Sequence, residues 1–300
     1  MPISRPVVVT LAALSAICVA ALCHGVRNSE PAPAVTTAPA EPVLPLDSYQ
    51  LSRRDVHTIE AAEDILILAC MRKQGLAWRM LPEPGAEEAD SRHTRRYGIM
   101  DAGAAARHGY HLPPLSPNQA RREAVWQARE KLPSRERLAA YGAKGVSGGC
   151  RGQARPRATG GVPPNWMNVL NKHSSQAFAA AQRAPEVVAV IQKWSACMAE
   201  AGHRYRDPFA ASGDPTWWRS ERPSARERSV AQTDVRCKEK VGLVSVWVQA
   251  DRRAQLDTIR EHPEDFRMLA ASKSASLNAA HTILRSSRSS AADRSPQAQR

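Results

Sequence analysis

Two stretches decide the fold of this chain: ACMRKQGLAWR at residues 69–79 and ACMAEAGHRYR at residues 196–206. Each places a cysteine before a glycine, an aromatic residue and an arginine, and a glycine at this position is typical of the end of a helix. A proline–serine pair, an Arg-Glu-Arg run and a second cysteine then follow each stretch in the same order. This shared order indicates an internal duplication, with one disulfide in each copy.

The duplication also predicts which cysteines pair. Two of the six cysteines lie in the apolar N-terminal run, which leaves Cys70, Cys150, Cys197 and Cys237 for the folded part. Four cysteines allow three pairings, and the duplication selects Cys70 with Cys150 and Cys197 with Cys237. The rival interpretation is a metal site made of these cysteines and histidines. Because no two of the four are separated by two to four residues, as most structural zinc sites require, we favour disulfides and predict no metal.

The N-terminus predicts the compartment. Arg5 precedes an apolar run over residues 7–22, so residues 1–27 form a signal peptide or, if they are not cleaved, a membrane anchor. Residues 28–52, rich in Pro and Ala, form a flexible linker. We therefore expect an extracytoplasmic protein that is secreted or anchored to the outer face of the cytoplasmic membrane. Membrane contact is expected only through the N-terminal segment.

The rest of the chain predicts an all-α fold. Aromatic residues make up only 5% of the sequence, and alanine-rich segments with apolar residues at helical spacing favour closely packed helices. A strand pattern appears only weakly, at residues 244–248. We expect helical units at residues 53–150 and 164–284, joined by a linker rich in Arg, Gly and Pro at residues 151–163. Residues 285–300 are expected to be disordered.

Local signals place individual helices within these units. We expect helices over residues 53–74 and 185–202, and a last helix from Pro263 to about residue 283. Ser224 and Glu227 have the spacing of a capping box. The glycine-rich residues around Cys150 are expected to be a flexible attachment point for its disulfide.

The charge of the chain restricts its partners. The net charge is +13, and the cations are 34 arginines and 8 lysines, a bias typical of a GC-rich genome. The sequence has no zinc finger, no basic zipper and no glycine–aromatic RNA signature, so we do not expect nucleic-acid binding. Anionic envelope polymers or another envelope protein are the expected partners.

Four aromatic residues are the candidate binding residues. Trp217 and Trp218 are adjacent in a polar loop, where large rings often anchor partners. The alternative is that the loop folds back and both rings cover the core. Tyr97 and Tyr110 lie in a segment that the second copy lacks, and complete the predicted set.

The sequence signals for catalytic residues are weaker than those for binding residues. Residues 145–149, GVSGG, match the G-x-S-x-G pattern, but the flanking sequence lacks the strand and helix that this motif needs, so a loop is favoured. His93, His108 and His111 are close in sequence, yet their spacing matches no zinc signature, and structural or exposed histidines are favoured. We assign no catalytic residue and no cofactor.

A second hypothesis is an envelope hydrolase whose site lies between the two units. It would use His203 with Asp207, or the group that contains His108 and His111. This hypothesis predicts that the side chains meet in a deep polar cleft.

The two A-C-M-x(3)-G-x(2)-aromatic segments, Arg96-Tyr97-Gly98, Gly109-Tyr110 and the paired later cysteines resemble uncharacterised secreted proteins of actinomycete-type bacteria. The resemblance covers roughly residues 55 to 245. It implies an envelope location and supplies no catalytic residues. The sequence as a whole predicts an exported binding or structural protein of the cell envelope, with no enzymatic activity.

Overall fold

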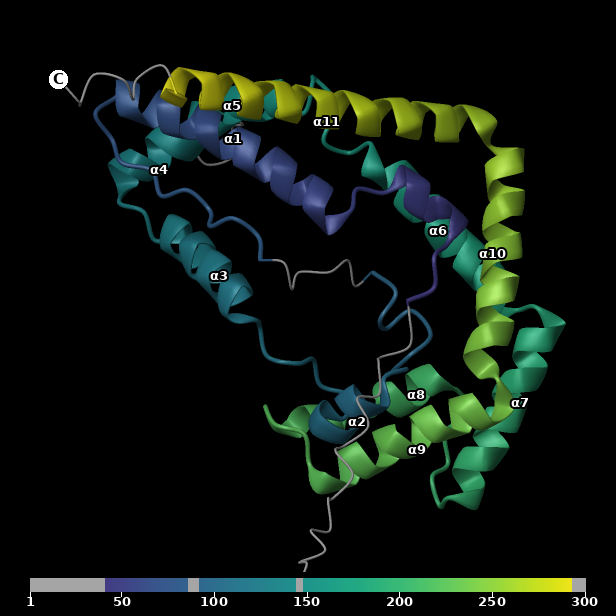
Figure 1. Ribbon diagram of the computed structural model, residues 1–300. Coiled ribbons are helices and arrows are strands. Elements are labelled where there is room, and N and C mark those ends of the chain that lie inside the picture. The colour runs from purple at the N-terminus through teal and green to yellow at the C-terminus, as the bar shows by residue number, and fades with distance from the viewer. Residues whose placement is uncertain (1–40, 86–91, 144–147, 293–300) are drawn as a thin grey trace, which may run out of the picture. The chain divides into compact units, whose positions relative to one another are not determined.

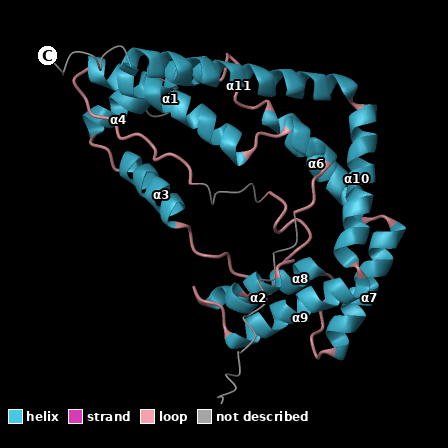
Figure 2. Ribbon diagram, in the orientation of Figure 1, coloured by secondary structure: helices cyan, strands magenta, loops and turns pink. Residues whose placement is uncertain are grey.

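The computed structural model describes residues 41–85, 92–143 and 148–292, all of which belong to one compact unit (Figure 1). The predicted signal peptide, residues 28–40 of the predicted linker and the Gly145–Ser147 part of the candidate serine motif lie outside the described residues. In the rest of that linker, residues 45–49 form a short helix and Leu44 and Leu46 are buried, so the expectation of a flexible linker is wrong there. Within the described ranges the regular elements are helices (Figure 2), which confirms the all-α prediction. None of these helices is both long enough and apolar enough to cross a membrane.

The described part of the chain contains two 3₁₀ helices and eleven α-helices. In chain order they are η1 (Pro45–Tyr49), α1 (Arg53–Lys73), α2 (Ala102–His108), α3 (Pro117–Glu130), α4 (Ser134–Tyr141), α5 (Gly149–Ala158), α6 (Met167–Gln182), α7 (Pro185–Glu200), α8 (Pro208–Ser212), η2 (Trp217–Arg219), α9 (Ala225–Val241), α10 (Leu243–Glu261) and α11 (Pro263–Ala292).

Helix ends form where the sequence carries capping residues. Ser52 caps α1, its side chain accepting a hydrogen bond from the Asp55 N–H, and the Asp55 carboxylate accepts one from the Ser52 N–H in return. After this helix the chain turns at Gly75, whose φ of +69° favours glycine. Only half of the predicted box forms at α9, because Ser224 accepts from the Glu227 N–H while the Glu227 carboxylate binds elsewhere.

The two predicted disulfides are present. Cys70 on α1 is bonded to Cys150 on α5, and Cys197 on α7 to Cys237 on α9, with Cα–Cα distances of 5.6 and 5.7 Å. These bonds span 80 and 40 residues, and closing loops of this size stabilises a fold by about 4 kcal/mol each in the chain-entropy model. The pairing derived from the duplication is therefore confirmed.

The two sequence halves share their cores. Tyr97 and Tyr110, from the first half, are buried in one hydrophobic cluster with Trp194 and Trp247 from the second. Conversely, α11 from the end of the chain packs against α1 and α5 (Figure 1). Neither half could bury its apolar surface without a segment of the other.

The segment around Cys150 is helical, and the expectation of a flexible attachment point and linker there is wrong. Helix α5 covers residues 149–158 and packs against α1, α4 and α11. Its buried residues, Cys150, Ala154 and Ala158, recur every four positions, which is one face of a helix. The Arg, Gly and Pro content of the exposed positions obscured this short stripe.

Two further expectations change. Residues 244–248 lie within α10, where Leu243 and Trp247 share one buried face, so the weak strand signal is overturned. Helix α11 runs to Ala292, well past residue 283, so residues 285–292 of the predicted tail are helical; the remaining eight residues lie outside the described part.

Candidate functional site

The four predicted binding residues differ in exposure. Tyr97 is 0% exposed, Tyr110 3% and Trp217 3%, whereas Trp218 is 55% exposed. The three buried rings belong to the core: the Tyr97 hydroxyl donates to Asp251, and the Trp217 indole N–H donates to the Ala211 carbonyl. The chain has few aromatic residues and uses these three to fill its interior. The prediction that they form a binding surface is therefore wrong for the exposed face of the protein, where only Trp218 remains.

His111 lies beside Trp218, with their ring centroids 4.9 Å apart. Its Nδ1 is 2.8 Å from a carboxylate oxygen of the buried Glu227, and its Nε2 is 3.0 Å from the Ser220 carbonyl oxygen. The hydrogen bond to Glu227 raises the pKa of His111. Because both nitrogens face acceptors, this environment favours the charged imidazole, in which both nitrogens donate a hydrogen bond.

The constellations expected of a hydrolase do not form in the described residues. His93 pairs with Asp47 at 2.8 Å, and the ring nitrogens of His111 face Glu227 and the Ser220 carbonyl instead of another histidine. The two carboxylate oxygens of Asp207 are taken by the Ala210 N–H and the Arg206 guanidinium, and no hydrogen bond joins that carboxylate to His203. These contacts agree with the favoured interpretation of the sequence, in which these histidines are structural or exposed.

A cavity of about 500 Å³ opens between the start of α1 and α3. Arginine outnumbers glutamate in its wall, and Trp126, Val56 and Leu115 add apolar surface. This volume is within the range of small-molecule sites in proteins. The full lining is Gln50, Leu51, Arg53, Val56, His57, Glu60, Arg92, Leu115, Gln119, Arg122, Glu123 and Trp126.

Two residues in the wall of this cavity, Arg122 and Glu60, form an ion pair. Arg122, from α3, places Nη2 2.5 Å from Oε2 of Glu60 on α1 and donates a second hydrogen bond to the Pro82 carbonyl. Burial raises the pKa of Glu60, and the carboxylates of Asp64 and Glu63 add to this rise, while the attraction of Arg122 opposes it. Because protonation of Glu60 would remove a negative charge, the wall becomes more positive as the pH falls.

A second, smaller cavity of about 120 Å³ shares Gln50 and Arg92 with the first. Its wall includes Asp47, His93 and Arg96. Burial would raise the pKa of Asp47, but hydrogen bonds from His93 and the Leu44 N–H outweigh it and lower that pKa. We name the walls of these two neighbouring cavities, taken together, the arginine groove.

A larger cavity of about 710 Å³ lies beside α5 and residues 159–164. Both arginines in its wall, Arg151 and Arg155, contact the single carboxylate of Glu63.

The chain matches no family model, no curated protein and no solved structure. The site therefore has to be interpreted from its own residues. Sequence reasoning missed the arginine groove because its arginines come from three separate parts of the chain, at position 53, positions 92 and 96, and position 122, and form no motif. A partial signal existed, since Arg122 and Trp126 are four residues apart on one helix face.

Proposed function

We propose that this protein is an extracytoplasmic binding protein of the cell envelope, and that its ligand is an anionic envelope component held in the arginine groove. The observation that carries the proposal is the wall of the larger cavity, where Arg53, Arg92 and Arg122 stand near Trp126. Two disulfides support the compartment, because such bonds persist in oxidising environments and are rare in the cytosol.

The residue types in the groove favour an anionic ligand with some apolar surface. Guanidinium groups bind carboxylates and phosphates through paired N–H donors, and they are more weakly hydrated than ammonium groups. Trp126 and Leu115 supply apolar surface in the same wall. A sugar acid or a phosphodiester polymer has both features, since each repeats anionic groups between less polar faces.

The first experiment is isothermal titration calorimetry of the full chain with poly(glycerol phosphate) and with polygalacturonate. Neutral dextran serves as the uncharged control. We expect binding to one or both anionic polymers, weakening as salt is raised, and no binding to dextran. Equal affinity for dextran would contradict the proposal.

Matched variants locate the binding site. The double substitution Arg53→Gln and Arg92→Gln should weaken binding roughly tenfold or more, equivalent to about 1.4 kcal/mol. Arg183→Gln, at an exposed position outside the groove, changes the charge in the same way and should have a smaller effect. The groove variant removes two charges and Arg183→Gln removes one. If the loss of binding free energy for each charge removed is the same in both, the polymer is attracted by the positive charge of the whole surface, and the groove is not the binding site.

A further inference from the structure

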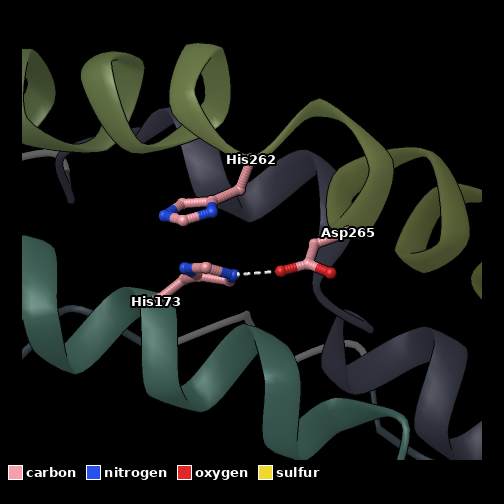
Figure 3. A group of neighbouring side chains, drawn as sticks. All are labelled: His173, His262 and Asp265. Atoms are coloured by element: carbon pink, nitrogen blue, oxygen red, sulfur yellow. Dashed lines mark hydrogen bonds and ion pairs between the residues drawn. The ribbon is translucent and has the colours of Figure 1, made fainter.

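Two histidines and an aspartate meet at the junction of α10 and α11, a group that sequence analysis did not identify. His262 follows the last residue of α10, and Asp265 lies in the first turn of α11. His173 reaches them from α6, about 90 residues earlier in the chain (Figure 3). One donor atom from each side chain lies within 4.8 Å of the others.

The contacts in this group are specific. His173 is only 3% exposed, and its Nε2 is 2.7 Å from Oδ2 of Asp265. The ring of His262 lies over the ring of His173 (Figure 3), with centroids 4.5 Å apart, and His262 is an exposed residue. Among the described residues the His262 ring makes no side-chain hydrogen bond, so its packing against His173 is the contact that places it.

The second nitrogen of His173 has no partner. Its Nδ1 is buried and makes no hydrogen bond within the described residues. Because the Nε2–H is donated to a carboxylate, the neutral ring carries its lone pair on Nδ1. Figure 3 shows one nitrogen of each ring on the side of the pair away from Asp265. With its lone pair free, the Nδ1 atom of His173 can act as a ligand for a cation.

We propose that His173 Nδ1 and a ring nitrogen of His262 bind a divalent transition-metal cation of the zinc class. Imidazole nitrogen suits Zn²⁺, Cu²⁺ and Ni²⁺, whereas Ca²⁺ and Mg²⁺ require oxygen ligands. Asp265 is the positioning residue, since a carboxylate that accepts the other ring N–H fixes the tautomer and orientation of a metal-binding histidine. This proposal is independent of the arginine groove.

The geometry needs one local adjustment. Two nitrogens that bind Zn²⁺ at about 2.0–2.1 Å in a tetrahedral site lie roughly 3.4 Å apart. His173 is held by α6 and Asp265, so the movement falls on the exposed ring of His262. Two protein ligands leave the remaining coordination positions to water or to an external donor, so we expect a moderate affinity and a site that stays open to exchange.

The test is calorimetric titration of the untagged, chelator-treated full chain with ZnCl₂. His262→Gln should lower the affinity at least tenfold and leave the fold unchanged, because this ring is exposed and makes no hydrogen bond. His281→Gln removes another exposed histidine from α11 and should leave Zn²⁺ binding unchanged. No heat of binding up to about 1 mM Zn²⁺, or equal affinity in His262→Gln and the wild-type chain, would overturn the proposal.

The role of Asp265 needs a separate readout. Asp265→Asn should weaken Zn²⁺ binding by about 10–100-fold, the usual effect of losing such a partner. In the wild-type chain labelled with ¹⁵N-histidine, Zn²⁺ should shift the Nδ1 resonance of His173 while Nε2 stays protonated. A shift at Nε2 instead would show that the metal displaces the Asp265 hydrogen bond, and would overturn the assignment of Asp265 as a positioning residue.

Discussion

Lys238 Nζ lies 3.0 Å from Oδ1 of Asp234, and these side chains are 2% and 0% exposed. The lysine also donates to the Ile99 carbonyl, and the aspartate accepts from Tyr110 and from the Trp194 indole. Burial lowers the pKa of Lys238 and raises that of Asp234, and their mutual attraction opposes both shifts. The pair joins both halves of the sequence inside one core.

Removing one partner of this pair should be more damaging than removing both. Lys238→Met leaves the Asp234 carboxylate buried without its cation, and we expect a loss of about 3–5 kcal/mol in the free energy of unfolding. The double variant Lys238→Met with Asp234→Asn removes the uncompensated charge and should lose less. Urea unfolding followed by circular dichroism measures both, and a double variant less stable than the single one would show that the charge is not the main cost.

Replacing Trp217 should destabilise the fold much more than replacing the adjacent Trp218. Trp217 is buried and hydrogen-bonded, so Trp217→Ala should cost about 3–5 kcal/mol. Trp218 is exposed, and Trp218→Ala should change stability by about 0.5 kcal/mol or less. Thermal unfolding of the two variants tests this contrast. Similar losses in both would mean that the two rings are equally buried.

His111 should make stability depend on pH above about 6.5, the ordinary pKa of histidine. Its pKa is raised by Glu227, so its contribution is fully present below the ordinary histidine value of about 6.5. That contribution is lost as the pH rises through the higher folded-state value, because the native state then gives up a proton that its hydrogen bonds had favoured. Unfolding free energies measured across this range should fall more in the wild-type chain than in His111→Gln. If the unfolding free energies of the wild-type chain and His111→Gln fell equally with rising pH, this role of His111 would be contradicted.

Each disulfide should contribute separately to stability. Replacing Cys70 and Cys150 by Ser, or Cys197 and Cys237 by Ser, should lower the unfolding free energy by about 2–5 kcal/mol. The first pair closes the longer loop and should have the larger effect, if native strain is equal. Urea unfolding of the two double variants measures both losses.

Non-reducing peptide mapping of protein secreted from its natural type of host checks the linkages. The same experiment reports the mature N-terminus, and a start near residue 22 or 26 would support signal-peptide cleavage over an anchor.

Local sequence signals predicted the helices well because a helix is stabilised by contacts within a few residues. Ser52 begins α1 and Pro185 begins α7, as capping and proline preferences indicate. Helix α5 was missed because its buried stripe is short and made of small residues. The predicted tail was only partly right, since α11 extends past residue 283.

The sequence by itself determined the helical class and the cysteine pairing, because periodicity, caps and the order of repeated residues are all written along the chain. Only the tertiary structure decided what the side chains do. Burial made Tyr97, Tyr110 and Trp217 core residues and left Trp218 exposed, and packing brought His173 to His262 and Arg53 near Arg122. These contacts form between helices that are distant in sequence. The packing of such helices is set by the summed burial of many residues, so no local sequence pattern predicts it.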